Sequence, residues 1–264
     1  MLIYKYVVLE RIDVLKNGSI RFTQADALND PFEIKPSFNS YRKLLKETYR
    51  EMLKSAVDAD KYSFIELESL LSNTTQTHIN ELRESLKKDF FVLSLTKERN
   101  NLAMWSHYTN AYQGFVIGFD SNNLFFQGKL PGLSPLYKIQ YAEKRPNFGK
   151  SLNENVNKEA MYKIFLTKSL HWNYEEELRM FAQYNIGYKI EKKDENGFDI
   201  YLFKFPSECL KEIIFGYQMK PEKKLEISDI VENHYSHAKL FETKLSETAF
   251  DLDIKPYRRP PQRY

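Results

Sequence analysis

Two short apolar stretches decide the fold: FFVLSL at residues 90–95 and FVIGF at residues 115–119. Each has the length of one β-strand, and an apolar run without alternation is typical of a strand that is buried on both faces. Between them there is room only for a short helix, which Asn100 or Asn101 is expected to cap. Strands and helices do not alternate along the chain as they do in βαβ units. We therefore expect an α+β fold with antiparallel or mixed sheets, and not a doubly wound nucleotide-binding fold.

The rest of the chain is expected to form one domain, residues 1–264, around these strands. Residues 41–88 carry apolar positions at helical spacing and almost no glycine or proline, which predicts a helical insertion. A strand is expected at residues 137–141, a helix at about residues 155–170 and a further strand at residues 178–184.

The composition excludes several classes of protein. Of the 264 residues, 42% are hydrophobic, which is enough for a core, and the formal charge of +3 gives no overall nucleic-acid signature. A single cysteine, Cys209, excludes an internal disulfide and a multi-cysteine zinc site. The apolar runs fall short of the ~18 residues that a membrane span needs, so we expect a cytoplasmic protein with no membrane partner. The tail at residues 257–264 holds three arginines and two prolines and is expected to be mobile.

The sequence MWSHY at residues 104–108 forms the first group of candidate functional residues. Trp105 and Tyr108 are three apart on one helical face. In the plainer interpretation they fill the core, while His107 bonds a neighbour. In the functional interpretation one of these rings forms a stacking wall and His107 donates to a ligand oxygen. The density of a hydroxyl group (Ser106), an imidazole and two rings within four residues favours a site.

The sequence WNYEEELR, from Trp172 to Arg179, forms the second group. If a strand begins at Tyr174, its period of two places Glu175, Glu177 and Arg179 on one face. That face is either a solvated ladder of ion pairs that adds little stability, or a place where Arg179 holds a carboxylate for use as a base or an orienting group. If the segment is helical instead, Glu175 and Arg179 form an ordinary pair four residues apart.

The third group is Asn29 and Asp30, in the sequence NDPFE. Short polar side chains before Pro31 usually make only a turn, but the same geometry can present both side chains to a cleft. His234 and His237 resemble a metal-binding pair, yet no third ligand is clear, and we predict no metal.

Several of these motifs occur together in a known family. In chain order they are YKY at residues 4–6, NDPF at 29–32, WSHY at 105–108, GF at 114–115, Tyr141, RP at 145–146, Lys168, WNYEEELR at 172–179 and IIFG at 213–216. In these motifs, and over nearly the whole chain, the sequence resembles the bacterial and phage family catalogued as domain of unknown function 2971. The family label implies no activity, although its members resemble cargo of defence or toxin loci. Their strand order is similar to that of ADP-ribosyltransferase folds, and by this analogy we expect a split sandwich.

This resemblance implies a protein that handles nucleotides, with NAD as co-substrate for ADP-ribosyl transfer or NAD cleavage and a protein or nucleic acid as acceptor. Breaking the glycosidic bond of NAD develops positive charge on the ribose, which a nearby carboxylate stabilises. Aromatic rings must hold the nicotinamide, and a basic group must meet the diphosphate. The catalytic residues that follow from this analogy are Glu177, His107 and Arg179. The substrate-binding residues are Lys5, Tyr6, Asn29, Asp30, Trp105, Ser106, Tyr108, Lys168, Trp172, Tyr174 and Glu175.

Two other functions stay open from the sequence. A metal-dependent nuclease would hold magnesium through Asp30, Glu175 and Glu177, with Lys168 near a phosphate. A non-catalytic module would hold a nucleotide or a protein, with the helical insertion at residues 41–88 as a partner surface. Each of these functions requires the candidate residues to meet in one cleft.

Overall fold

The computed structural model describes residues 1–56, 64–88, 90–147, 162–183 and 186–260. Its contacts divide the chain into two compact units, each assembled from separate segments. The first unit consists of Met1–Thr23, Phe91–Lys138 and Asn173–Tyr264, and the second of Gln24–Phe90 and Ile139–Trp172.

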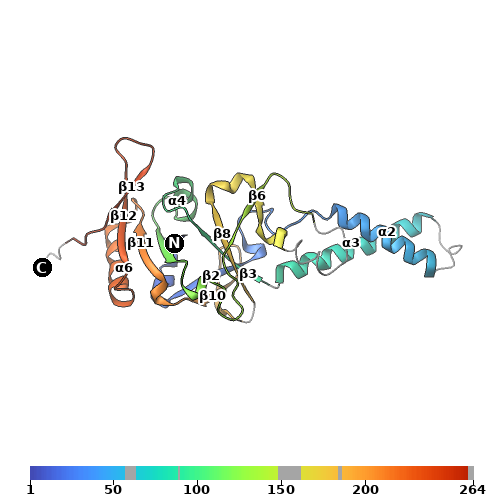
Figure 1. The fold of residues 1–264 in the computed structure, drawn as a ribbon, viewed down its shortest axis with the longest axis horizontal. Coiled ribbons are helices and arrows are strands. Elements are labelled where there is room, and N and C mark those ends of the chain that lie inside the picture. Colours follow the sequence, from blue (N-terminus) through green and yellow to red (C-terminus); the bar gives the residue numbers. More distant parts are fainter. Residues whose placement is uncertain (57–63, 89, 148–161, 184–185, 261–264) are drawn as a thin grey trace. The chain divides into compact units, whose positions relative to one another are not determined.

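A large mixed sheet dominates the first unit (Figure 1). Its strands are β1 (Leu2–Val7), β2 (Ser19–Gln24), β3 (Phe90–Thr96), β4 (Phe115–Asp120), β5 (Tyr137–Lys138), β8 (Glu177–Gln183), β9 (Tyr188–Lys193), β10 (Asp199–Lys204), β11 (Leu210–Phe215), β12 (Lys239–Leu245) and β13 (Leu252–Pro256). The order is β13-β12-β11-β4-β1-β3-β2-β10-β9, and β8 pairs with β3 and β5. Strands β11 and β12 are parallel, whereas β4 is antiparallel to both β1 and β11.

The two apolar stretches of the sequence form strands near the middle of this order. Every side chain of residues 115–119 in β4 is buried, and in β3 only Phe90 and Ser94 are partly exposed. Both stretches are therefore confirmed as buried strands, and β4 lies between two neighbours as a central strand should.

Short helices connect and cover the strands of the first unit. They are α1 (Asp13–Asn17), α4 (Leu102–Tyr108) and α6 (Pro221–His234), together with the 3₁₀ helices η1 (Leu9–Arg11), η4 (Leu124–Phe126), η5 (Leu170–Glu175, which begins in the second unit) and η6 (Ser207–Cys209). Helix α1 ends at Gly18, whose φ of 56° is the left-handed conformation that glycine adopts without strain. The hydroxyl group of Tyr235, just after α6, donates to the backbone oxygen of Leu15 at 2.9 Å and so ties α6 to α1.

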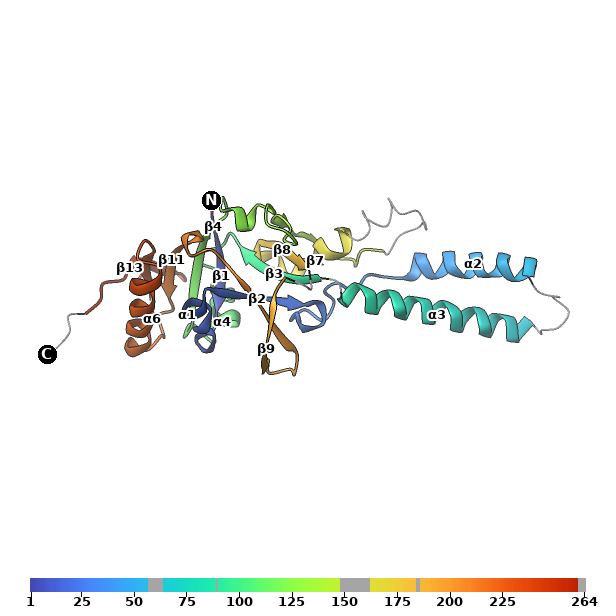
Figure 2. The same ribbon diagram turned by 90° about the horizontal axis from the view of Figure 1, so that it is seen from below.

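The second unit contains the helical insertion, observed as α2 (Asn39–Ala56) and α3 (Phe64–Lys88). The two helices run side by side in both views (Figures 1 and 2). Their buried apolar side chains include Leu45, Leu71 and Ile79. The unit also holds η2 (Ala25–Ala27) and a parallel pair of short strands, β6 (Gln140–Ala142) and β7 (Thr167–Ser169).

The strand predicted at residues 137–141 is wrong as a single element. Its first part is β5, which pairs with β8 in the large sheet, and its last part belongs to β6, which pairs with β7. The break lies at Ile139, whose side chain is buried. A local apolar pattern predicts extended backbone here, but not that the chain passes from one unit to the other.

The helix predicted at residues 155–170 is only partly correct. Residues 148–161 lie outside the described part of the chain, residues 162–166 are helical, and residues 167–169 form β7. Strand β9 was not predicted, because most of its side chains are exposed and polar and its order comes from pairing with β10. Of the tail expected to be mobile, residues 261–264 also lie outside the described residues.

The α+β class with a mixed sheet is confirmed. None of the helices formed by the described residues has the length and apolar character that crossing a membrane requires.

Candidate functional site

Helix α4 places the Trp-Ser-His-Tyr motif. Its N-terminus is capped by Asn101, whose side-chain oxygen accepts a hydrogen bond from the backbone nitrogen of Met104 at 3.1 Å. Trp105 is fully buried and meets the ring of Tyr6 edge to face at 5.4 Å. Trp105 and Tyr6 are therefore part of the core. The plainer interpretation is confirmed for Trp105, whereas Tyr108 is only partly buried and packs against this core. Ser106 lies on the exposed side of α4.

The last residues of α4 contact the segment that precedes β8. The hydroxyl group of Tyr108 donates to the carboxylate of Glu175, and the hydroxyl group of Tyr174 lies 3.3 Å from Nδ1 of His107. The side-chain amide of Asn101 also donates to the backbone oxygen of Tyr174 at 2.9 Å. The first unit thus brings together His107, Tyr108, Tyr174 and Glu175, which lie far apart in the sequence.

The predicted alternation of Glu175, Glu177 and Arg179 on one face is wrong for Glu175. This residue ends η5, and the next residue, Glu176, has a φ of +42°, so the strand begins only at Glu177. The side chain of Glu175 is buried, and its backbone oxygen accepts a hydrogen bond from the hydroxyl group of Thr96. A break in the backbone therefore separates Glu175 from the face that Glu177 and Arg179 share.

Glu177 and Arg179 form a buried ion pair. Oε1 of Glu177 accepts hydrogen bonds from Nε of Arg179 at 3.0 Å and from Nη2 at 2.9 Å. The side chains are 2% and 0% exposed, so the solvated ladder is wrong. These two hydrogen bonds hold the buried Glu177 carboxylate against Arg179. Lys5 on β1 donates to the backbone oxygen of Ser94 at 2.9 Å, which joins β1 to β3.

The second unit holds the other candidate residues and a pocket. In the Asn-Asp-Pro-Phe-Glu turn, Oδ1 of Asp30 accepts a hydrogen bond from the backbone nitrogen of Phe32 at 2.9 Å. The backbone oxygen of Asp30 accepts another from the nitrogen of Glu33 at 3.1 Å. The first bond forms an Asx turn and the second closes a β-turn over residues 30–33, which Pro31 favours by fixing its own φ. The turn is confirmed, and it buries Asp30, which is 4% exposed.

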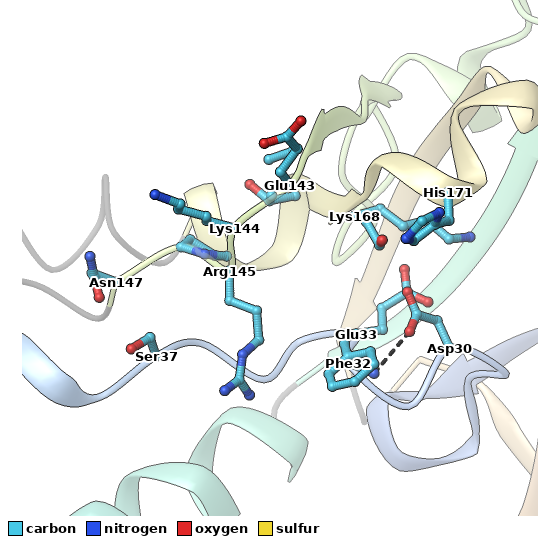
Figure 3. A pocket seen from close by; sticks show the side chains of 14 residues that line it. Asp30, Phe32, Glu33, Ser37, Glu143, Lys144, Arg145, Asn147, Lys168 and His171 are labelled. Carbon is cyan, nitrogen blue, oxygen red and sulfur yellow. Dashed lines mark hydrogen bonds between the residues drawn. The ribbon is translucent and has the colours of Figure 1, made fainter.

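The pocket has a volume of about 540 Å³ and lies between this turn, the end of β6 and β7 (Figure 3). Its charged and titratable side chains are those of Asp30, Glu33, Glu143, Lys144, Arg145, Lys168 and His171. In Figure 3, Asp30 and Glu33 lie on one side with Lys168 and His171, and Arg145 lies on the other side with Ser37. Such a pocket has the size of a small-molecule site and offers both acceptors and cations.

Burial separates the charges of this pocket into two sets. Asp30, Glu33 and Lys168 are 4%, 3% and 5% exposed, whereas Glu143, Lys144, Arg145 and His171 are exposed. The ammonium group of Lys168 also lies 5.0 Å from the ring centroid of Trp172. Asn29 and Trp172 do not line the pocket.

Among the charged and titratable residues that line this pocket, sequence reasoning did not name five as site residues: Glu33, Glu143, Lys144, Arg145 and His171. Glu33 completes the Asn-Asp-Pro-Phe-Glu turn, and the Glu-Lys-Arg-Pro run at residues 143–146 is a polar break directly after a strand. That break is a signal of a loop that carries charge. It lies near the turn because the backbone nitrogen of Ser37 donates to the backbone oxygen of Pro146 at 2.9 Å, a contact that no local pattern predicts.

The described residues contain no group of three histidine, cysteine, aspartate or glutamate side chains that could hold a metal ion. The candidate residues that were expected to share one cleft divide between the two units.

Comparison with known proteins gives one match. The model of a family described as Protein of unknown function (DUF2971) matches residues 104–180, which include the Trp-Ser-His-Tyr motif and Trp172 to Met180. No curated protein and no solved structure matches the chain, so the likeness to ADP-ribosyltransferase folds stays a prediction. The resemblance predicted over nearly the whole chain is thus shorter than expected: this chain is similar to the DUF2971 family over residues 104–180.

Proposed function

We propose that the protein handles nucleotides and that NAD, or a related ribonucleotide, binds in the pocket of the second unit. The observation that carries this proposal is the division of charge in the pocket. Buried carboxylates at Asp30 and Glu33 face the same hollow as the exposed cations Lys144 and Arg145. A nucleotide has the matching division, because its diphosphate needs cations and its sugar and base offer hydrogen-bond donors.

The exposed ring of Phe32 adds a third element. It is 60% exposed, it lines the pocket, and the guanidinium carbon of Arg145 lies 5.9 Å from its ring centroid. A ring beside an arginine offers a base or a nicotinamide a stacking surface and offers a phosphate a bidentate donor.

The proposed reaction is cleavage of NAD or transfer of its ADP-ribosyl group. The bond between the nicotinamide nitrogen and C1′ of the ribose breaks, and its electron pair leaves with the neutral nicotinamide. Water, or a hydroxyl group of a protein or nucleic-acid acceptor, then bonds to C1′ and releases a proton. Positive charge develops on the ribose in the transition state, and a buried carboxylate close to it lowers the barrier.

The structure leads us to assign this step to a different carboxylate from Glu177, which the sequence had suggested. Glu177 is already paired with Arg179 inside the first unit, which leaves it little capacity to stabilise another cation. Asp30 and Glu33 face a pocket of the right size, so we assign the step to one of them.

The proposal is tested by calorimetric titration of the protein with NAD and with ADP-ribose, followed by measurement of nicotinamide release. We expect Arg145→Gln to weaken binding about 10-fold or more, since charge-assisted hydrogen bonds to phosphate contribute about 1.5–3 kcal/mol. Lys43→Gln, on the exposed surface of α2, is the matched control and should bind normally.

Two results would change the conclusion. Failure of NAD, ADP-ribose and ATP to bind at millimolar concentration would reject the proposed function. Binding of NAD without release of nicotinamide would reject the reaction and would make the pocket that of a non-catalytic binding module.

A further inference from the structure

One oxygen of Asp30 has no partner. Oδ1 accepts the hydrogen bond from the nitrogen of Phe32, but Oδ2 is buried and has no hydrogen-bond partner among the described residues. A buried acceptor that has lost its hydrogen bonds to water and makes none within the protein destabilises the folded state, and such atoms are therefore rare. An acceptor of this kind in the wall of a pocket is explained if a ligand donates to it.

The orientation of this oxygen is fixed before any ligand arrives. The Asx turn holds Oδ1 on the nitrogen of Phe32, and the bond between Glu33 and the backbone oxygen of Asp30 holds the turn itself. The carboxylate cannot rotate Oδ2 away without breaking the first of these bonds. A preorganised acceptor loses little conformational entropy on binding, so its single hydrogen bond contributes strongly to selectivity.

We propose that Oδ2 of Asp30 accepts a hydrogen bond from a ribose hydroxyl group, so that the pocket selects ribonucleotides over deoxyribonucleotides. This inference rests on the proposed function, because it names the part of the nucleotide that Asp30 contacts.

The charges of the pocket favour a hydroxyl donor over an ammonium donor. Three acidic and three basic side chains line the hollow, and one of the basic ones, Lys168, is buried on the same side as Asp30. A cationic ligand would meet Lys168 as well as the carboxylates, and it would leave the exposed cations Lys144 and Arg145 with Glu143 alone as an exposed counter-charge. A neutral hydroxyl group together with a phosphate satisfies both sets of side chains in one ligand.

The test compares pairs of ligands that differ in one hydroxyl group: ADP-ribose against ADP-2′-deoxyribose, ribose 5-phosphate against 2-deoxyribose 5-phosphate, and ATP against 2′-dATP and 3′-dATP. Calorimetry should show that loss of the hydroxyl group that Asp30 contacts weakens binding about 10- to 100-fold. This comparison needs only the wild-type protein, so it does not depend on whether a variant folds.

Asp30→Asn then assigns the selectivity to this residue. The amide keeps the size of the side chain and an oxygen for the nitrogen of Phe32, but it directs a donor into the pocket where the acceptor was. The preference for the ribose form should fall below about threefold, since the charge-assisted bond is lost. Asp26→Asn removes the same charge from an exposed position outside the pocket and should keep the full preference.

The outcomes separate this inference from the proposed function. Equal affinity of the ribose and deoxyribose forms would overturn the inference and leave nucleotide binding intact. Absence of binding by every phosphorylated ligand would overturn both. Displacement of ADP-ribose by millimolar 1,4-diaminobutane would show that the acidic end takes an amine, which also overturns the inference.

Discussion

Asp30 and Glu177 are both buried carboxylates, but they differ in what surrounds them. Glu177 receives two hydrogen bonds from Arg179 on its own strand, whereas one buried oxygen of Asp30 has no hydrogen-bond partner among the described residues. The sequence placed Glu177 and Arg179 on one face through the period of two of a strand, and a carboxylate held by Arg179 was one of the interpretations left open. It did not predict their burial, which depends on what covers that face.

The buried pair gives the first prediction, on stability. Arg179→Met should lower the free energy of unfolding by about 3–5 kcal/mol, because it removes the guanidinium group from the buried charge of Glu177. The double variant Arg179→Met with Glu177→Leu should recover much of the loss, since two apolar side chains fill the site without charge. Urea unfolding of both variants measures the difference. A loss below about 1 kcal/mol for the single variant would show that the pair does not hold β8 in place.

The only cysteine gives a second prediction, on pH. Burial, and after it the charge of Glu208, raises the pKa of the Cys209 thiol to about 12. In the folded protein the thiol of Cys209 is favoured over the thiolate, whereas in the unfolded chain the thiol ionises at about pH 8.5. Its contribution to stability is therefore complete below that pH and is lost as the pH rises towards 12.

Two measurements check this behaviour of Cys209. A thiol reagent at pH 8 should react slowly with the folded protein and rapidly in urea, because only the thiolate attacks. Between pH 9 and 11, the free energy of unfolding should fall more steeply with pH for the wild type than for Cys209→Ala. Rapid reaction of the folded protein would contradict the burial of this side chain.

At the scale of elements, the sequence predicted those whose pattern is set by their own residues. The strand at 115–119 and the cap of α4 at Asn101 are examples, because apolar content and a capping side chain act locally. The prediction failed where partners decide the structure. Strand β7 follows a helical pattern in sequence but pairs with β6, and β9 is polar but pairs with β10. Backbone breaks such as the one at Glu176 leave no pattern in the sequence either.

The turn after α4 gives the third prediction. Asn110, Ala111 and Tyr112 have φ angles of 50°, 50° and 66°, a left-handed conformation that costs a non-glycine residue roughly 1–2 kcal/mol. Glycine adopts this conformation without strain, so Ala111→Gly should raise the melting temperature by a few degrees, corresponding to about 0.5–1 kcal/mol.

A matched control for this prediction lies in α4 itself. Ala103→Gly makes the same chemical change inside the helix and should lower stability by about 1 kcal/mol, because glycine is a poor helix former. The two variants are thus expected to shift the melting temperature in opposite directions. A decrease for both would mean that the side chain of Ala111 contributes more by packing than its backbone costs.

At the scale of the whole molecule, the candidate site was predicted least well. Each unit is assembled from segments that alternate along the chain, and neither periodicity nor composition shows which segments belong together. The sequence named Asp30 and Lys168 as candidates. The side chains that share their pocket, such as Arg145 and His171, come together through the pairing of β6 with β7 and the bridge between Ser37 and Asn147. Conversely, the aromatic residues Tyr6 and Trp105 were predicted to bind a ligand, but both are buried in the core.

The last prediction locates the ligand in the chain. If the nucleotide binds in the pocket of the second unit, ADP-ribose should slow hydrogen exchange in three separate segments: residues 30–37, 142–147 and 167–171. The physical reason is that contacts with the ligand order these loops, and hydrogen exchange reports their local opening.

The hairpin of β12 and β13 in the first unit serves as an internal reference and should exchange at an unchanged rate. Arg145→Gln should weaken the protection in all three segments together. Protection confined instead to α4 and the segment at Glu175 would place the nucleotide on the cluster of His107, Tyr108 and Tyr174, and the pocket around Asp30 would then not be the binding site.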